Sequence, residues 1–325
     1  MTDKITWGII GCGDVTELKS GPAFNKVENS SLIAVMRRNA AKAEDYAKRH
    51  QVSKWYSNAD DLINDPDINA VYIATPPSSH EEYAIKALRA GKNVYVEKPM
   101  SLSEAACLRM LSAVKETGNK LSVAHYRRTM PFFVKIKELI ESGIIGNINC
   151  VNLKMMQGSE NLIITETEDN WRLSPTLSGG GLFHDLAPHQ IDMIFYLFGS
   201  VKKAGGLSAN KAKQSEADDM VAGQILFDND ILFNGLWCFN NPSAENVDLC
   251  EVIGTKGKIS FAFFGQTKIT IAIEDREEVI EVLHPMHVQQ PMIDKVVKYF
   301  LGKEENPCTA TEGAEILRIM DLFTN

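Results

Sequence analysis

The sequence predicts an α/β protein with a doubly wound parallel sheet, followed by an α+β domain with a large, mostly antiparallel open sheet. Its 325 residues exceed one ordinary core, which favours two domains. Up to about residue 124, short apolar runs alternate with helical patterns, and beyond it strand-like runs follow one another closely. We therefore expect one domain over residues 1–124 and a second over residues 125–325.

The first domain is expected to contain parallel strands with helices on both faces of the sheet. Five apolar runs are typical of strands that such helices bury on both sides. These runs are "ITWGII", "SLIAVM", "NAVYIAT", "KNVYVE" and "KLSVAH". Segments such as "NAAKAEDYAKRH" and "EEYAIKALRAG" have the period of amphipathic helices, so they are the predicted crossovers.

The second domain is expected to begin with a helix, "MPFFVKIKELIESG", that Gly143 caps. The strand-like runs that follow are "INCVNLKMM", "MVAGQILFD", "ILFNGLWCF", "VDLCEVIG", "KISFAFF", "KITIAIE" and "EEVIEVL". Turn residues in "FDND" and "GTKG" suit hairpins, which favours an open antiparallel sheet. Two helical patterns end the chain, and Thr311 is the predicted N-cap of the second.

Composition and charge argue against several kinds of partner. The formal charge of −8 provides no basic surface for a nucleic-acid backbone, so we expect no nucleic-acid partner. No run approaches a membrane span or a signal peptide, so we expect no membrane association. Six widely spaced cysteines favour reduced thiols and a cytoplasmic location; they are Cys12, Cys107, Cys150, Cys238, Cys250 and Cys308.

A glycine-rich turn ends the first expected strand. Gly11 can make the tight turn, and Gly13 lets the backbone approach a pyrophosphate at the start of the next helix. Thr16 stands where glycine or alanine usually gives close helix packing. A glycine pattern between a strand and a helix favours a dinucleotide site, and the alternative is a structural tight turn. The predicted cofactor contacts are Gly11, Cys12, Gly13, Asp14 and Val15.

Two arginines follow the second expected strand, at the position where an NAD site carries an acid for the ribose hydroxyls. Guanidinium groups of Arg37 and Arg38 can pair with a 2′-phosphate, whereas a carboxylate would repel it. The pair therefore favours NADP over NAD as the cofactor. The alternative is an exposed basic pair on a helix-entry loop.

The segment "IATPPSSH" ends a further expected strand. Its two prolines remove backbone donors and force an extended path, so three residues are predicted to line the cofactor at the carboxyl edge of the sheet. These residues are Thr75, Pro76 and Pro77; His80 is expected to begin the next helix and is a further predicted cofactor contact. A rigid loop with an N-capping serine is the alternative.

The segment "NVYVEKP" places Lys98 just beyond a strand, where ligands of open parallel sheets bind. A Lys–Pro bond can be cis at far lower cost than other peptide bonds, and a cis bond would aim the lysine into the ligand site. A surface lysine in a turn is the alternative.

A helical pattern after three glycines, "SGGGLFHDLAPHQIDMI", carries an acid and a base. Asp185 and His189 are four residues apart and therefore share one face of the helix. An imidazole exchanges protons near neutral pH and a carboxylate can orient it, which suits general acid–base chemistry. A metal site is the competing hypothesis, but His184 lies ~140° round the helix from His189, so we expect no metal. A histidine that only packs or caps is the other alternative.

These motifs together resemble the glucose-fructose oxidoreductase / inositol dehydrogenase / MocA (Gfo/Idh/MocA) family. The resemblance extends over nearly the whole chain, and the motifs occur in the family's order. They are "GIIGCGDVT", "VMRRN", "ATPPSSH", "VYVEKPM", "HYRRTMP", "NWRLSPTLSGGG" and "DLAPH".

The resemblance implies an N-terminal Rossmann domain and a C-terminal sheet that also supports a homodimer or homotetramer. It implies NAD(P)-dependent oxidation of a sugar or polyol hydroxyl, or the reverse reduction. Lys98 and His189 become the catalytic pair, Asp185 lies between substrate and base, and Glu97 contacts the cofactor side of its loop. Weaker similarities add Arg127, Trp171 and Arg172 as cofactor contacts.

The sequence thus predicts an NADP(H)-dependent oxidoreductase that transfers a hydride to or from a secondary alcohol or carbonyl of a sugar, polyol or related diol. Specificity is expected from residues 155–170 and the far edge of the sheet. Two alternatives stay open: an NAD-retaining glycoside hydrolase of the same fold, and a non-catalytic NADP-sensing module.

Overall fold

A computed structural model describes residues 3–158 and 171–324. Most of the segment predicted to set specificity, residues 159–170, lies outside the described residues. The chain forms two compact units, the first made of residues 1–130 and 285–317 and the second of residues 131–284 and 318–325. Among the described residues, no helix combines the length and the apolar character needed to cross a membrane.

The first unit is built on a six-stranded parallel sheet in the order β3-β2-β1-β4-β5-β6, as the alternating apolar runs predicted. The central strands are buried on both faces because helices follow each of them; on β5, Val94, Tyr95 and Val96 are fully buried. The strands are β1 (Ile5–Ile10), β2 (Ser30–Met36), β3 (Lys54–Tyr56), β4 (Ala70–Ile73), β5 (Asn93–Val96) and β6 (Leu121–Val123).

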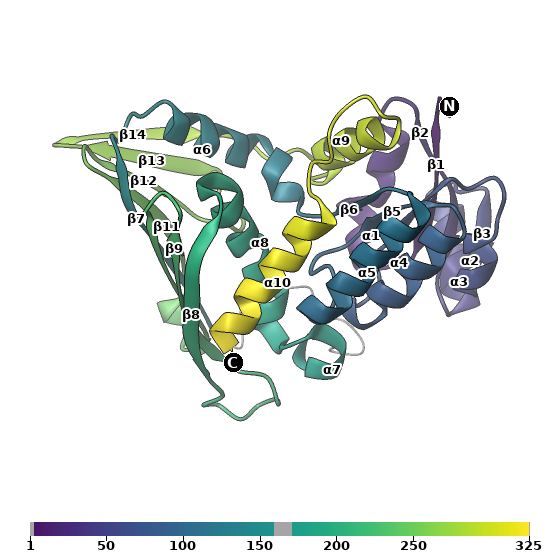
Figure 1. The fold of residues 1–325 in the computed structure, drawn as a ribbon, viewed down its shortest axis with the longest axis horizontal. Coiled ribbons are helices and arrows are strands. Elements are labelled where there is room, and N and C mark those ends of the chain that lie inside the picture. The colour runs from purple at the N-terminus through teal and green to yellow at the C-terminus, as the bar shows by residue number, and fades with distance from the viewer. Residues whose placement is uncertain (1–2, 159–170, 325) are drawn as a thin grey trace. The chain divides into compact units, whose positions relative to one another are not determined.

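The helices of the first unit alternate with these strands, and α4 and α5 pack side by side (Figure 1). They are α1 (Asp14–Leu18), α2 (Ala40–Arg49), α3 (Ala59–Ile63), α4 (His80–Arg89) and α5 (Glu104–Thr117). A later segment returns to this unit with α9 (Gln290–Phe300) and the first part of α10 (Ala310–Thr324).

The second unit contains an eight-stranded sheet in the order β14-β13-β12-β11-β7-β10-β9-β8, with the strands in one continuous layer (Figure 1). All neighbouring strands are antiparallel except β7 and β10. The strands are β7 (Ile148–Gly158), β8 (Val201–Ala209), β9 (Met220–Phe227), β10 (Leu232–Asn241), β11 (Val247–Gly254), β12 (Lys258–Phe261), β13 (Lys268–Ile273) and β14 (Arg276–Glu281). The predicted fold class is confirmed.

One face of this sheet packs against helices of the same unit. Trp237 on β10 donates a hydrogen bond from Nε1 to Gln190 on α8 at 2.6 Å, and its ring packs edge-on against Phe183. The helices are α6 (Pro131–Glu141), α7 (Pro175–Ser178) and α8 (Gly181–Phe198). Gly143 follows α6 with a φ of 69°, a left-handed conformation that glycine adopts without strain, as its predicted capping role requires.

The predicted N-cap of the last helix was wrong by two residues. Helix α10 begins at Ala310, and the hydroxyl of Thr309 accepts a hydrogen bond from the Glu312 amide at 3.2 Å. The Glu312 carboxylate in turn accepts from the Thr309 amide at 2.8 Å, which completes a capping box. Thr311 lies inside the helix.

Candidate active site

Parallel strands bring the predicted cofactor and lysine motifs to one edge of the first unit. Gly11 follows β1, Thr75 follows β4 and Lys98 follows β5, and these three strands are neighbours in the sheet. The carboxyl ends of parallel strands share an edge, and this edge is where open α/β sheets bind ligands.

The glycine turn leaves space where a phosphate would approach the backbone. Gly11 has a φ of +92°, and a Cβ there would lie 2.8 Å from Cγ2 of Thr75, so only glycine fits. At Gly13 the nearest heavy atom to such a Cβ is 3.9 Å away, so this position is open. The backbone at Gly13 is therefore open to a pyrophosphate, which is what the second glycine of a dinucleotide site provides.

Thr16, the departure from the usual glycine pattern, is fully buried and has its own partners. Its hydroxyl donates to the Gly13 carbonyl at 2.7 Å, and its carbonyl accepts from the Tyr46 hydroxyl at 2.7 Å. Gly21 allows the close packing instead, because a Cβ there would lie 2.2 Å from the backbone oxygen of Thr16. The threonine thus stabilises the turn rather than disrupting it.

The two arginines after β2 have different environments. Arg37 is half-buried and its Nη1 donates to the Cys12 carbonyl at 3.5 Å, which keeps its guanidinium beside the glycine turn. Arg38 is exposed. Arg37 is therefore the better placed candidate for a 2′-phosphate, because its guanidinium is held beside the glycine turn.

The Cys12 thiol in this turn is neutral. Burial raises its pKa to about 11, against the opposing effect of Arg37.

His80 links the two loops that follow β4 and β5. It is the first residue of α4 and is fully buried. Its Nε2 lies 2.8 Å from the Thr75 carbonyl and its Nδ1 lies 3.0 Å from the Pro99 carbonyl. Burial lowers the pKa of His80, which favours the neutral ring in spite of these two carbonyls.

The loop after β5 is fixed around Lys98. The Lys98–Pro99 peptide bond is cis, the conformation that the sequence allowed. The preceding Glu97 is buried, and its carboxylate accepts from the Tyr72 hydroxyl at 2.5 Å and from the Lys98 amide at 3.1 Å. Lys98 itself is half-buried. The buried carboxylate of Glu97 and its hydrogen bonds thus restrain the backbone at Lys98.

Arg127 also belongs to the first unit, on the short helix η3 (Tyr126–Thr129). It is buried, and its guanidinium carbon lies 5.6 Å from the ring centre of Tyr126. A buried cation stacked on an aromatic ring is held in one orientation.

Within the second unit, Asp185 and His189 share one face of α8, as predicted. The Asp185 carboxylate accepts from Nε of Arg172 at 3.0 Å, and both side chains are largely buried. The same guanidinium stacks on Trp171, with its carbon 4.6 Å from the ring centre. His189 is buried and packs edge-on against Phe264 at 5.9 Å.

The neighbouring His184 has a different environment. Its ring packs against Gly180, where a Cβ would lie 2.1 Å from Nδ1, and burial lowers its pKa. The second glycine of the triplet therefore makes room for this ring. His184 is therefore a packing residue, and its burial favours the neutral ring.

Two side-chain partnerships carry no signal in the sequence. The pairing of Arg172 with Asp185 joins residues 13 apart across a helix entry. The contact of Gln289 with Glu97, at 2.7 Å, joins residues 192 apart. Neither spacing belongs to a recurrent motif, so only the fold reveals them.

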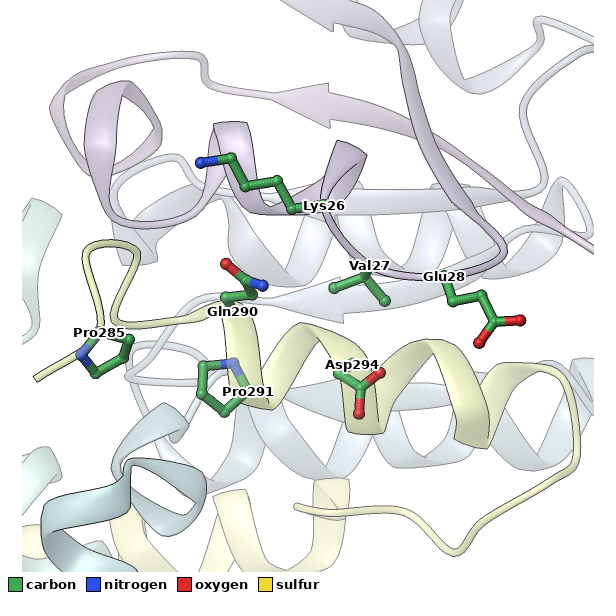
Figure 2. A pocket seen from close by; sticks show the side chains of 7 residues that line it. All are labelled: Lys26, Val27, Glu28, Pro285, Gln290, Pro291 and Asp294. Atoms are coloured by element: carbon green, nitrogen blue, oxygen red, sulfur yellow. The ribbon is translucent and has the colours of Figure 1, made fainter.

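A shallow pocket of about 350 Å³ lies elsewhere on the first unit, beside the start of α9 (Figure 2). Its lining mixes charges of both signs with prolines, and it includes none of the predicted site residues. It is lined by Lys26, Val27, Glu28, Pro285, Gln290, Pro291 and Asp294.

The fold defines a class: an oxidoreductase with a parallel, dinucleotide-binding sheet in one unit and a large, mostly antiparallel sheet in the other. Residues 5–125 match the oxidoreductase family model GFO_IDH_MocA, with an NAD-binding Rossmann fold, and residues 133–260 match the GFO/IDH/MocA C-terminal domain. The chain belongs to the Gfo/Idh/MocA family, a family of sugar and polyol oxidoreductases with an NAD(P)-binding fold.

Relatives and solved structures support this assignment. Oxidoreductase P35 of Formosa agariphila is 49% identical over 323 residues, which cover 99% of both chains. The scyllo-inositol 2-dehydrogenase (NAD(+)) of Bacillus subtilis is 28% identical over 277 residues, covering 83% of this chain and 78% of the relative. A levoglucosan dehydrogenase, solved with NADH and levoglucosan, has the same fold, with a TM-score of 0.85, 23% identity and coverage of 98% and 96%.

Proposed function

We propose that the protein transfers a hydride between NADP(H) and a secondary alcohol or carbonyl of a sugar, polyol or related diol. The observation that carries this proposal is the shared carboxyl edge of β1, β4 and β5, because the glycine turn, Thr75 and Lys98 each follow one of these neighbouring strands. Ligands of open parallel sheets bind at this edge, which supports a nicotinamide bound beside Lys98.

The chain supplies charge stabilisation and proton transfer. When bound, the nicotinamide accepts or returns the hydride. As an alcohol is oxidised, negative charge builds on its oxygen, and the Lys98 ammonium stabilises that charge. His189 takes the hydroxyl proton, and in the reverse direction it returns the proton to the carbonyl oxygen. Asp185 orients the substrate and the imidazole.

The cofactor preference rests on Arg37. Its guanidinium lies beside the glycine turn through the contact with the Cys12 carbonyl, so it can pair with a 2′-phosphate. Arg38, exposed on the same loop, adds positive charge. The remaining proposed contacts are Gly11, Cys12, Gly13, Asp14, Val15, Thr75, Pro76, Pro77, His80, Arg127 and Trp171.

We assign Arg172 to the orientation of Asp185 rather than to the cofactor. Its Nε already donates a hydrogen bond to the Asp185 carboxylate, and its guanidinium stacks on Trp171. A guanidinium held on two sides acts as a fixed donor for the acid.

We also propose a homodimer or homotetramer formed through the uncovered face of the second unit's sheet. Leu236 on β10 and Leu249 on β11 flank Lys154 on β7 in register, and both leucines are exposed. Exposed leucines at the centre of a sheet favour a partner surface of the same kind. Separately, we propose a cytoplasmic location, because all six cysteines are free thiols.

A substrate panel tests the proposed function. Purified protein is mixed with NADP⁺ or NADPH and a panel of sugars, polyols, ketoses and dihydrodiols, and nicotinamide absorbance is followed. Turnover of at least one compound supports the proposal. Release of the aryl group from aryl glycosides without added cofactor would favour a hydrolase instead, and NADPH binding without any turnover would favour a sensing module.

A further inference from the structure

Gln289 is a buried glutamine whose side chain has a fixed direction. It lies directly before α9 and is fully shielded from solvent. Its backbone is bound at both ends: its amide donates to the Lys19 carbonyl at 3.2 Å, and its carbonyl accepts from the Ile293 amide at 2.9 Å. These two hydrogen bonds fix the backbone, so the side chain can point elsewhere only if they break.

The two ends of the Gln289 amide have complementary partners. Nε2 donates to Oε1 of Glu97 at 2.7 Å, and Oε1 accepts from the Tyr95 hydroxyl at 3.5 Å. A carboxylate accepts and does not donate, so the amide nitrogen must be the end that faces it. Burial raises the pKa of Tyr95 well above its ordinary value, so its hydroxyl remains a donor.

The Glu97 carboxylate is surrounded by donors. Tyr72 and Gln289 both donate to Oε1, at 2.5 Å and 2.7 Å, and the Lys98 amide donates to Oε2 at 3.1 Å. Burial, followed by the charge of Glu97, raises the pKa of Tyr72 well above its usual range, so Tyr72 also stays protonated. A buried carboxylate is stable only with such partners, and here both of its oxygens are occupied.

This arrangement fixes the peptide group from which Lys98 projects. Before Lys98, the Glu97 amide donates to the Ile73 carbonyl at 2.9 Å, which continues the sheet. After it, the Pro99 carbonyl faces His80 at 3.0 Å. Between these points, the hydrogen bond from the Lys98 amide to Glu97 restrains the backbone, and Gln289 and Tyr72 hold that carboxylate in place.

We propose that Gln289 is a positioning residue for Lys98 and acts through the buried carboxylate of Glu97. The inference rests on the proposed role of Lys98 and deepens it. Residues 285–317 return to the first unit late in the chain and, through Gln289, help to hold the loop after β5 that carries Lys98. It also assigns the Glu97 side chain to the loop rather than to the cofactor.

A matched pair of variants tests the inference. Gln289→Met keeps the length of the side chain and removes both ends of the amide, whereas Gln290→Met changes the adjacent glutamine, which lines the open pocket instead (Figure 2). Hydrogen exchange at the Lys98 amide, followed by mass spectrometry without any ligand, is expected to accelerate about tenfold in Gln289→Met, as for the loss of a restraining hydrogen bond. Gln290→Met is expected to leave it unchanged.

A coupling measurement separates positioning from a general loss of structure. With the panel compound that the wild type turns over fastest, Gln289→Met is expected to lower kcat about tenfold and to change the Kd of NADPH less than about twofold. In a Lys98→Met background it is expected to have no further effect, because the residue through which it acts is gone. Glu97→Gln, which keeps the shape of the side chain, is the second variant and is expected to behave like Gln289→Met.

Two results would overturn the inference. One is unchanged exchange at the Lys98 amide in both Gln289→Met and Glu97→Gln. The other is that Gln289→Met lowers kcat as much in the Lys98→Met background as in the wild type. Failure of the proposed function has a different signature. Wild-type protein would then turn over no panel compound, while the exchange measurement would still report on the link between Gln289 and Lys98.

Discussion

Nε of Arg172 donates to Oδ2 of Asp185 at 3.0 Å, and this pair joins the Trp171 segment to the helix that carries His189. The pair is largely buried, so removing one partner takes a counter-charge away from the other. Because Asp185 is the proposed orienting acid, the geometry of the whole acid–base face depends on Arg172.

Replacing Arg172 is therefore expected to slow catalysis. Arg172→Met should lower kcat between about tenfold and a hundredfold, since the carboxylate loses its fixed donor. Arg172→Lys should recover part of the loss, because an ammonium can make one of the contacts but cannot stack as a plane. Steady-state kinetics and NADPH titration check this; a change confined to the Kd of NADPH would instead identify Arg172 as a cofactor contact.

The two glycines of the turn are expected to respond differently to alanine. Gly11→Ala should destabilise the protein by at least about 1 kcal/mol, because its φ is +92° and the new Cβ would meet Thr75. Gly13→Ala should leave the melting temperature unchanged, since its Cβ meets no heavy atom closer than 3.9 Å, and should weaken NADPH binding more than about tenfold. Thermal melts and NADPH titrations separate the two effects. Equal NADPH affinity in Gly13→Ala and wild type would show that the cofactor does not approach this backbone.

Arg37 tests the choice of cofactor. Arg37→Asp should raise the Kd of NADPH about a hundredfold and that of NADH only slightly, because a charge-assisted pair with the 2′-phosphate is replaced by repulsion. Arg38→Asp, on the exposed neighbour, is the matched control and should have a smaller effect. Equal losses for the two nucleotides in Arg37→Asp would show that the 2′-phosphate is not recognised there.

Glu312 predicts how stability depends on pH. Burial raises the pKa of its carboxyl, but the Arg128 guanidinium at 2.5 Å and the Thr309 hydrogen bonds outweigh burial and lower the pKa below its ordinary value of 4.5. A lowered folded-state pKa contributes stability above the unfolded value, and this contribution is lost as the pH falls through the folded-state value.

The corresponding measurement is the free energy of unfolding between pH 7 and pH 3. Glu312→Gln should be less stable than wild type at pH 7, and the difference should shrink as the pH falls below about 4.5. Glu305→Gln, at an exposed acid of the same region, is the control and should match wild type throughout. A difference between wild type and Glu312→Gln that stays constant with pH would contradict the assigned ion pair.

Much of the fold could be predicted because its signals are local. Apolar runs identified five strands of the parallel sheet, but β3 was missed because "KWY" is short and partly exposed. Strand β8 was missed because "VKKAGGLSA" mixes lysines and glycines, and it lies at the edge of the sheet. The capping box at Thr309 was available in the sequence as Thr-x-x-Glu, and it explains why Thr311 was the wrong choice.

Residues of the candidate site could be proposed from the sequence only where they follow a strand or share a helix face. Lys98, Asp185 and His189 could be named on those grounds. Tyr72 and Gln289 could not, because their role depends on a carboxylate that lies far away in sequence. Contacts between remote buried polar groups are set by the tertiary fold and leave no periodic trace.

The most direct test of the proposed chemistry is the pair of values measured on Lys98→Met: the Kd of NADPH and the kcat with the best panel compound. The methionine keeps the apolar stem of lysine and removes the ammonium that stabilises the reacting oxygen. We expect a Kd within about threefold of wild type and a kcat lowered at least about a thousandfold, in line with the loss of an oxyanion-stabilising group. A variant that turns over at a near-normal rate would contradict the assignment of Lys98 to catalysis.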